Sequence, residues 1–146
     1  MADLLREVRR RFDFCLLDAP AGLGRGFQLA TCAADRCVVV TTADASSLRD
    51  AQHTVMELDR FPSGALHLVV NRVRKKLLRQ LHATIDDAID KAGLPLLGVV
   101  PEDDALPLCM NRGVPILLAD GQSAATAYRN IAKRLQGERV PLLRIR

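Results

Sequence analysis

Short apolar runs alternate with amphipathic stretches along most of the chain. Four of these runs are nearly continuous in Val, Leu, Ile and similar residues, and they occupy residues 12–17, 37–42, 66–71 and 96–100. Continuous apolar runs of this length are typical of parallel strands that are covered on both faces. We therefore predict four buried parallel strands.

The stretches between the runs have the apolar spacing and end signals of helices. The opening helix is expected at residues 4–11. We also expect two helices that begin with S/T-x-x-D capping boxes, a short helix capped by an aspartate, and a final helix. Their markers are, in chain order, Ser47 with Asp50, Thr84 with Asp87, Asp103 or Asp104 with Gly113, and Ser123 with Gly137. Alternating strands and helices predict one α/β domain with a parallel sheet and right-handed crossovers.

Composition narrows the classes of function. The 146 residues are 49% hydrophobic and 26% charged, which indicates a globular chain. No apolar run reaches the length of a membrane span and no signal peptide is evident, so a cytoplasmic protein is expected. Aromatic residues are only 3% of the chain, and the net charge of +4 is mild. Since base-stacking surfaces need aromatic platforms, we expect no nucleic-acid partner.

Asp18 follows the first apolar run, and the glycines Gly22, Gly24 and Gly26 come soon after it. Ligands of parallel α/β sheets bind at the carboxyl ends of the strands, where such an acid can hold Mg²⁺. The alternative is that Asp18 is a helix N-cap or a turn residue. From this feature alone both interpretations remain open.

Longer segments resemble the MinD branch of the ParA/MinD ATPases, which are P-loop proteins with a deviant Walker motif. The matching segments are DAPAGLGRGF at 18–27, VVVTTADASSLRD at 38–50, VNRV at 70–73, PLLGVVPED at 95–103, NRGVP at 111–115 and YRNIA at 128–132. They follow the family order from about residue 12 to residue 141. The resemblance implies a P-loop NTPase-like fold of the SIMIBI class, with a parallel sheet flanked by helices.

The resemblance also implies a site for ATP or ADP with Mg²⁺. By position, Asp18 corresponds to the Walker B aspartate, which acts on Mg²⁺ through water. Asn71 corresponds to the asparagine that reads the adenine edge, and its amide supplies the necessary donor and acceptor. The remaining nucleotide-site positions are the switch II turn, Pro20, Ala21 and Gly22, and the loop over the base, Pro101, Glu102 and Asp103.

The family role is to bind ATP, form a homodimer, attach peripherally to the membrane and recruit a division inhibitor to determine the septum site. MinC-like or MinE-like partners would dock on residues that match the family's regulatory surface: Asp44, Ser46, Ser47, Arg49 and Asp50. Two alternatives remain open. One is a non-catalytic remnant or regulatory binding module, and the other is a ParA-type relative that partitions DNA.

One family feature is missing from these residues. The lysines are Lys75, Lys76, Lys91 and Lys133, and none follows a glycine, so the 146 residues contain no Gly-Lys phosphate-binding loop. We therefore interpret residues 1–146 as one partial domain, the C-terminal part of a MinD-like ATPase without its N-terminal strand and P-loop. It should not hydrolyse ATP alone.

The missing strand would lie between the runs at 12–17 and 37–42. Its absence should leave a gap there or make the two runs pair directly. An open parallel edge would invite aggregation or partner binding.

Overall fold

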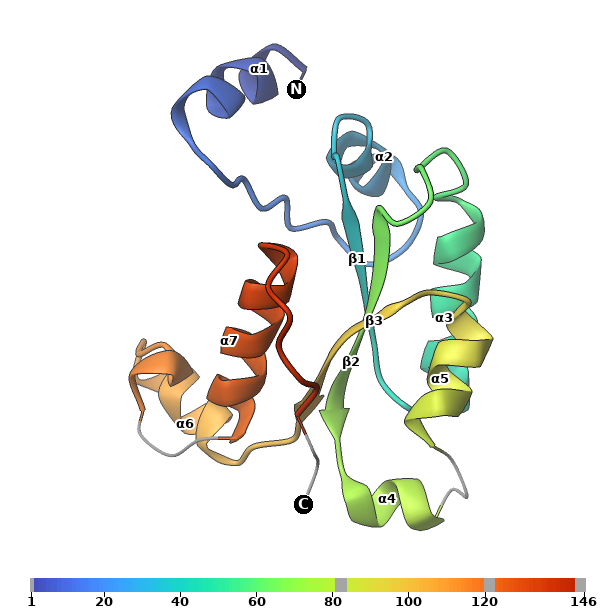
Figure 1. The fold of residues 1–146 in the computed structure, drawn as a ribbon, viewed down its shortest axis with the longest axis vertical. Helices are drawn as coiled ribbons and strands as arrows, with labels where there is room; N and C mark the ends of the chain where they lie inside the picture. Colours follow the sequence, from blue (N-terminus) through green and yellow to red (C-terminus); the bar gives the residue numbers. More distant parts are fainter. Residues whose placement is uncertain (1, 81–83, 120–122, 144–146) are drawn as a thin grey trace.

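The computed structural model describes residues 2–80, 84–119 and 123–143, and its centre is a three-stranded parallel sheet (Figure 1). The strands are β1 (Cys37–Thr41), β2 (Leu66–Val73) and β3 (Leu96–Pro101), in the order β1-β2-β3. The register pairs Cys37 with Leu66 and Val70 with Val99. The predicted α/β fold with a parallel sheet is confirmed.

Helices connect the strands and extend beyond them. They are α1 (Ala2–Arg11), α2 (Arg25–Thr31), α3 (Ala45–Met56), α4 (Lys75–Gln80), α5 (Ile85–Ala92), α6 (Ala105–Asn111) and α7 (Ser123–Leu135), with a 3₁₀ turn, η1 (Ile116–Leu118). The capping box of Thr84 and Asp87 is confirmed. The one at Ser47 is wrong, because Asp44 is the N-cap and accepts the Ser47 N–H. Helices α2 and α4 were not predicted.

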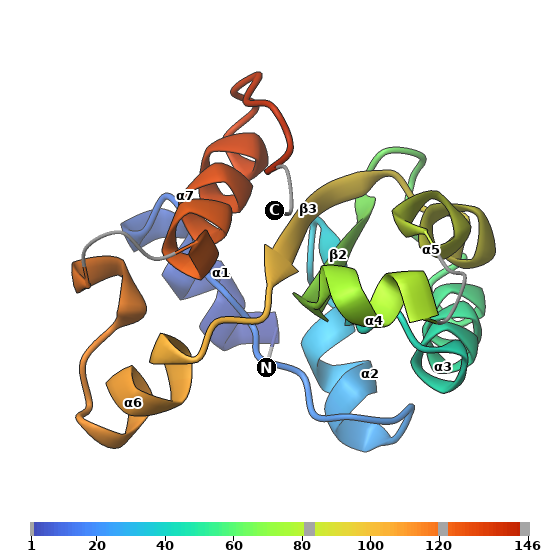
Figure 2. The ribbon, with the colours of Figure 1, turned by 90° about the horizontal axis from the view of Figure 1, so that it is seen from below.

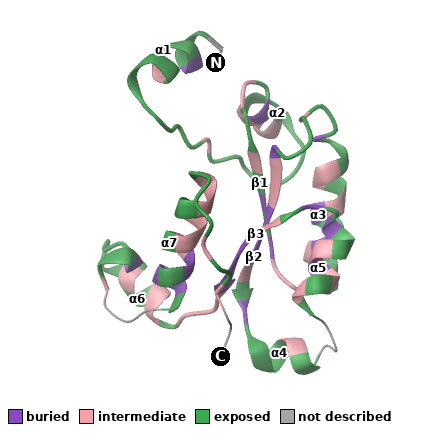
Figure 3. Cartoon of the chain, viewed as in Figure 1, coloured by how far each residue is buried: buried purple, intermediate pink, exposed green. Residues whose placement is uncertain are grey.

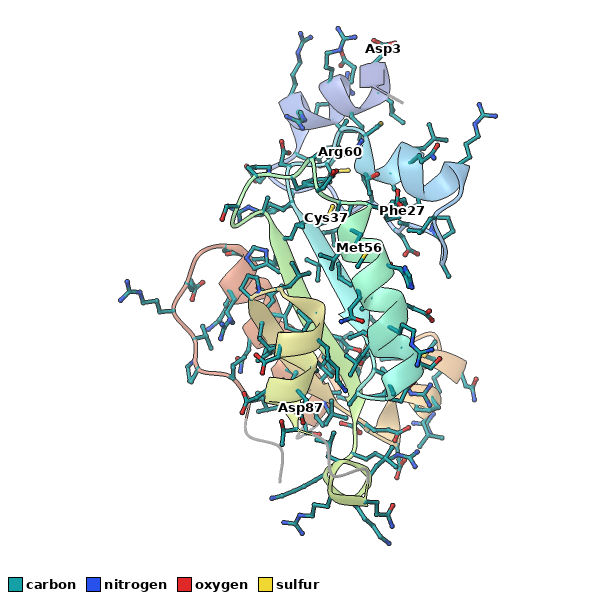
Figure 4. The ribbon with its side chains drawn as sticks, turned by 90° about the vertical axis from the view of Figure 1, so that its right-hand side faces the viewer. Asp3, Phe27, Cys37, Met56, Arg60 and Asp87 are labelled. Carbon is teal, nitrogen blue, oxygen red and sulfur yellow. The ribbon has the colours of Figure 1, made fainter. Side chains whose placement is uncertain are left out.

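Two apolar cores lie on opposite faces of the sheet, and the helices that cover them are visible in two views (Figures 1 and 2). On one face, α3 and α5 bury Leu48 and Ala88 against Val39 and Val70. On the other face, α7 packs mainly on β3. Phe27 of α2 packs against the first core near its edge, at the same end as Cys37 (Figure 4). The sheet is therefore covered on both faces, as its apolar strands require.

The predicted strand at residues 12–17 is wrong. This segment is extended but not part of the sheet, and it is mostly exposed between α1 and α2 (Figure 3). Phe14 is 64% exposed and Leu16 is 87% exposed. The physical reason is that a strand needs a hydrogen-bonded neighbour, and β1 pairs only with β2 among the described residues. Of the two expected outcomes, the structure has the gap and not direct pairing.

The cysteines also differ from expectation. Cys15 and Cys37 have apolar neighbours in the sequence, and such neighbours predict that a free cysteine is buried as a small hydrophobe. All four cysteines are free, but Cys15 and Cys32 are exposed, and Cys37 and Cys109 are half-buried. Burial raises the pKa of the Cys37 thiol. Among the described residues, no helix is both long enough and apolar enough to cross a membrane.

Candidate functional site

A cavity of about 1560 Å³ separates the extended segment from the sheet. Its walls are residues 12–23, β1 and parts of α2 and α3, and it also reaches the end of α7. Small-molecule pockets usually measure about 300–1,000 Å³, so this space is larger than a nucleotide-sized ligand requires. The cavity follows directly from the failure of residues 12–17 to join β1.

Five predicted nucleotide-site residues line this cavity. Asn71 comes from β2, and the others come from the segment between α1 and α2: Asp18, Pro20, Ala21 and Gly22. Gly22 has a φ of +86°, a conformation that side chains other than glycine rarely adopt. The structure therefore brings the expected metal-side acid and the expected base-side amide to one cavity.

A local irregularity in β2 positions Asn71. The register with β3 breaks between Val70 and Val73, and Arg72 has a φ of 53°. The Asn71 Oδ1 atom accepts the N–H of Arg72 at 2.9 Å. This bond occupies the carbonyl oxygen of the Asn71 side chain, and Asn71 also lines the cavity. Such bulges often re-aim a side chain beside a functional site.

A hydroxyl and carboxylate cluster lies beyond the carboxyl end of β1. The Thr42 hydroxyl donates to Asp44 at 2.5 Å and lies 2.8 Å from the Ser47 hydroxyl. The Ser47 N–H also donates to Asp44, at 3.0 Å. The Thr42 hydroxyl, then the Ser47 backbone and hydroxyl, lower the pKa of Asp44 to about 2. Asp44 is thus committed to capping α3.

The predicted partner surface divides into two groups. Asp44 and Ser47 are half-buried and engaged in the cap, whereas Ser46, Arg49 and Asp50 are exposed on α3. Ser47 and Asp50 also line the cavity. Only Ser46 and Arg49 therefore lie on the outer surface, away from both the cap and the cavity.

The predicted loop over the base lies outside the cavity lining. Pro101 ends β3 and pairs with Val73. Glu102 forms ion pairs with Arg72 and Arg74. The Asp103 carboxylate accepts the N–H of Ala105, the first residue of α6, at 3.1 Å and that of Ala124, in the first turn of α7, at 3.1 Å. The structure thus gives Glu102 and Asp103 side-chain partners within the protein.

The charges around the cavity suit a metal better than a phosphate group. Asp18 offers one carboxylate, and Mg²⁺ needs only one or two together with water and substrate phosphate. In the described lining there is no lysine. Its arginines are engaged elsewhere, Arg9 with Asp35 and Arg36 with the Leu135 carbonyl. The described residues also contain no group of three or more metal-binding side chains.

Sequence reasoning missed the contacts that organise this end of the sheet. Thr42 joins the cap of α3, and Arg72 with Arg74 holds Glu102. The Asp44-x-x-Ser47 spacing could have identified the cap, because a side chain at the N-cap accepts the N–H three residues later. No local pattern could have found the ion pairs, since their partners are about thirty residues apart.

Comparisons with known proteins agree with this architecture. The family model described as "Cellulose biosynthesis protein BcsQ" matches residues 1–135. The septum site-determining protein MinD of Synechocystis is 33% identical over 146 residues, covering 98% of this chain and 54% of that protein. The chain therefore spans about half the length of the curated relatives it matches.

Two solved structures show the likeness in three dimensions. The MinC:MinD cell division protein complex of Aquifex aeolicus matches with a TM-score of 0.90 and 31% identity, over 97% of this chain and 59% of that chain. MinD of Pyrococcus horikoshii, complexed with Mg-ADP, matches with a TM-score of 0.77 and 26% identity, over 91% of this chain and 54% of that chain.

The fold defines a MinD/ParA-type P-loop NTPase architecture. Within that class, the chain belongs to the BcsQ family of ParA/MinD-like proteins. The predicted family resemblance is therefore confirmed.

Proposed function

We propose that this chain supplies the metal-side and base-side half of an adenine-nucleotide site in a MinD-like septum-site protein. The observation that carries the proposal is that Asp18 and Asn71 line the same cavity, which runs along β1. The Pyrococcus relative, whose structure is a complex with Mg-ADP, supports the choice of ligand. In the complete site, nucleotide binding would promote a homodimer that attaches peripherally to the membrane.

Each site residue has a distinct task in this proposal. Asp18 holds Mg²⁺ through water, and the Asn71 amide contacts the adenine edge. Pro20, Ala21 and Gly22 form a turn beside the phosphates, and the backbone of residues 101–103 borders the base. Bound Mg²⁺ would supply charge neutralisation to the phosphates. Because the described lining lacks a lysine and an unengaged arginine, the phosphates have no strong cationic partner.

Titration calorimetry of the 146-residue chain with Mg-ADP tests the nucleotide site. We expect weak binding that Asp18→Asn and Asn71→Ala each reduce at least fivefold. Asp90→Asn and Asn111→Ala are matched controls, because both positions are exposed and neither lines the cavity. Equal binding by the two site variants and the two controls would reject the nucleotide site.

The exposed part of α3 is the proposed dock for a division inhibitor. Ser46 and Arg49 are exposed there, and Asp50 connects them to the cavity rim. The MinC:MinD neighbour supports a MinC-like partner, and the same surface is proposed for MinE-like regulators. A partner on this helix would thus sense the region where the nucleotide binds.

A binding assay with a purified MinC protein tests this surface. Arg49→Glu reverses an exposed charge on α3 and should weaken capture at least tenfold. Arg79→Glu makes the same change on exposed α4 and should leave capture unchanged. If both variants bind like the parent chain, this surface is not the dock.

The family match favours a second candidate function, a role in cellulose biosynthesis. Disruption of the gene in its host separates the two candidates. Misplaced septa with normal cellulose staining would support the septum-site role. Normal septa with lost cellulose staining would support the second candidate and reject the first.

A further inference from the structure

A basic cluster lies where β2 leads into α4. It consists of five cationic side chains within eight residues, with no acid among them: Arg72, Arg74, Lys75, Lys76 and Arg79. All five are exposed, and α4 lies at the end of the molecule opposite α1 (Figure 1). Within the described chain, Glu102 is the one acid that pairs with the cluster. The chain has 21 basic and 17 acidic side chains, so 16 of each remain without these six. Its whole net charge of +4 therefore belongs to this cluster.

Three members of the basic cluster have no partner among the described residues. The two arginines before α4 share the Glu102 carboxylate. The side chains of Lys75, Lys76 and Arg79, by contrast, form no ion pair or hydrogen bond with any described residue. Helix α4 has no buried residue, and it packs against the first core only through the half-buried Leu78. The three cations are therefore available to an anion from outside the chain.

These three cations lie on one face of α4. Lys75 and Arg79 are four residues apart, as are Lys76 and Gln80, and side chains at that spacing are neighbours on a helix. The four side chains line a hollow of about 520 Å³. Like charges four residues apart destabilise a helix, and so do cations in its first turn, where α4 has no acid. An anion bound in the hollow would remove this repulsion.

An apolar side chain and a carboxylate contact indicate the chemistry of that anion. Leu77 follows Lys76 around the helix and is 45% exposed, so a ligand that covers the cations can also cover this leucine. The pairing of Glu102 with two arginines shows that this cluster accepts a protein carboxylate. A ligand with carboxylates on either side of an apolar group would match both features.

The same features disfavour the other polyanions. A protein on duplex DNA typically neutralises about 6–10 phosphates, whereas α4 offers three free cations and has no aromatic residue. A helix that lies in a membrane interface needs an apolar face, whereas α4 has six residues and one exposed leucine. A short acidic peptide is the ligand that fits the size and the chemistry of this surface.

We propose that the basic face of α4 binds an acidic segment of another protein, in which carboxylates flank an apolar residue. The carboxylates pair with Lys75, Lys76 and Arg79, and the apolar residue covers Leu77. The inference goes beyond the proposed function and does not depend on nucleotide binding. The partner is also distinct from the proposed division inhibitor, whose dock is on α3.

The probe is a labelled peptide with the sequence Gly-Ser-Glu-Asp-Leu-Glu-Asp-Ser-Gly. Fluorescence anisotropy with the 146-residue chain should show saturable binding that weakens as salt rises from about 50 to about 300 mM. Lys75→Glu with Lys76→Glu should weaken binding at least tenfold. The matched control is Lys91→Glu with Lys133→Glu, which reverses two exposed lysines outside the cluster and should leave binding unchanged. Leu77→Ser, or serine for the leucine of the peptide, should weaken binding at least threefold.

Unfolding of the variants would not imitate the expected result. Acids suit the first turn of a helix, so Lys75→Glu with Lys76→Glu should melt no earlier than the parent chain. Arg79→Gln makes a milder change on the same face and should weaken peptide binding at least threefold.

Three results would overturn the proposal. The first is equal binding by the cluster variant, Lys75→Glu with Lys76→Glu, and its control, Lys91→Glu with Lys133→Glu. The second is binding of duplex DNA or of phosphatidylserine vesicles that is tighter than peptide binding and is lost in the cluster variant, because the partner would then be a nucleic acid or a membrane. The third is a dimer in sedimentation that the cluster variant dissociates, because the occupant would then be a second copy.

Discussion

At the residue scale, Asp44 acts as the N-cap of α3, and it does so in its ionised form. It caps α3 by accepting the Ser47 N–H, and the Thr42 hydroxyl donates to it as well. These bonds favour the charged form and hold the pKa of Asp44 at about 2, below its ordinary value of 3.8. The ionised side chain is therefore more stable in the folded chain than in the unfolded chain.

Removing this cap should lower the free energy of unfolding. Asp44→Ala is expected to cost about 1 kcal/mol at neutral pH, as for other N-caps. Asp44→Asn keeps an acceptor and should cost less. Urea unfolding followed by circular dichroism measures both. Ser46→Ala, which changes an exposed residue of the same helix turn, is the control.

The pH dependence of this effect has a defined sign. Because the pKa is lowered on folding, the stabilisation is fully present above about pH 4 and is lost as the pH falls toward 2. The stability difference between the parent chain and Asp44→Asn should therefore shrink across that interval. A difference that stays constant from pH 5 to pH 2 would contradict the assignment of the low pKa to Asp44.

At the scale of elements, the contact between β3 and α7 depends on one glycine. A Cβ atom at Gly98 would overlap Cγ1 and Cδ1 of Ile131, so the helix could not approach the strand as closely. Helix α7 makes its main sheet contact with β3, and this contact builds the second apolar core. A side chain at position 98 would therefore separate a helix from the sheet.

Gly98→Ala should destabilise the chain by about 1–3 kcal/mol, the usual cost of overpacking a core. Thermal unfolding measures the loss. Gly24→Ala is the matched control, because nothing lies within 4 Å of a Cβ there and the glycine has an ordinary φ of −74°. Gly98→Ala should cost less in an Ile131→Ala background than in the parent chain, because alanine lacks both Cγ1 and Cδ1. An equal cost in the two backgrounds would mean that the clash is not the cause.

At the scale of the whole molecule, the residues around the cavity should support nucleotide binding but not ATP hydrolysis. The acid and the amide line it, but its described lining has no lysine and its arginines are engaged. Catalysis of phosphoryl transfer depends mainly on groups that stabilise the charge of the transferred phosphoryl group. A chain that lacks these groups should therefore not hydrolyse ATP. The 146-residue chain is expected to release phosphate from Mg-ATP no faster than a buffer blank. Release above the blank that Asp18→Ala abolishes would contradict this.

The amino-acid sequence by itself determined the elements whose interactions are local or whose burial is complete. The apolar runs at 37–42, 66–71 and 96–100 predicted three strands, and Thr84 with Asp87 predicted a capping box. The apolar runs placed Asp18 just after one strand and Asn71 at the end of another. Residues 12–17 form no strand, and Asn71 lies within β2, two residues before its end. Local spacing was informative there because caps and covered strands depend on nearby residues.

Tertiary structure decided what depends on partners distant in the chain. The run at 12–17 has the composition of a strand, but a strand exists only where another strand accepts its hydrogen bonds. In the described chain β1 pairs with β2 alone, so that run stays outside the sheet and a cavity opens beside it. The ion pairs of Glu102 and the bond between Asp103 and α7 likewise require residues about twenty to thirty positions away. The sequence therefore determined the family, and the pairing of strands decided where its binding site is open.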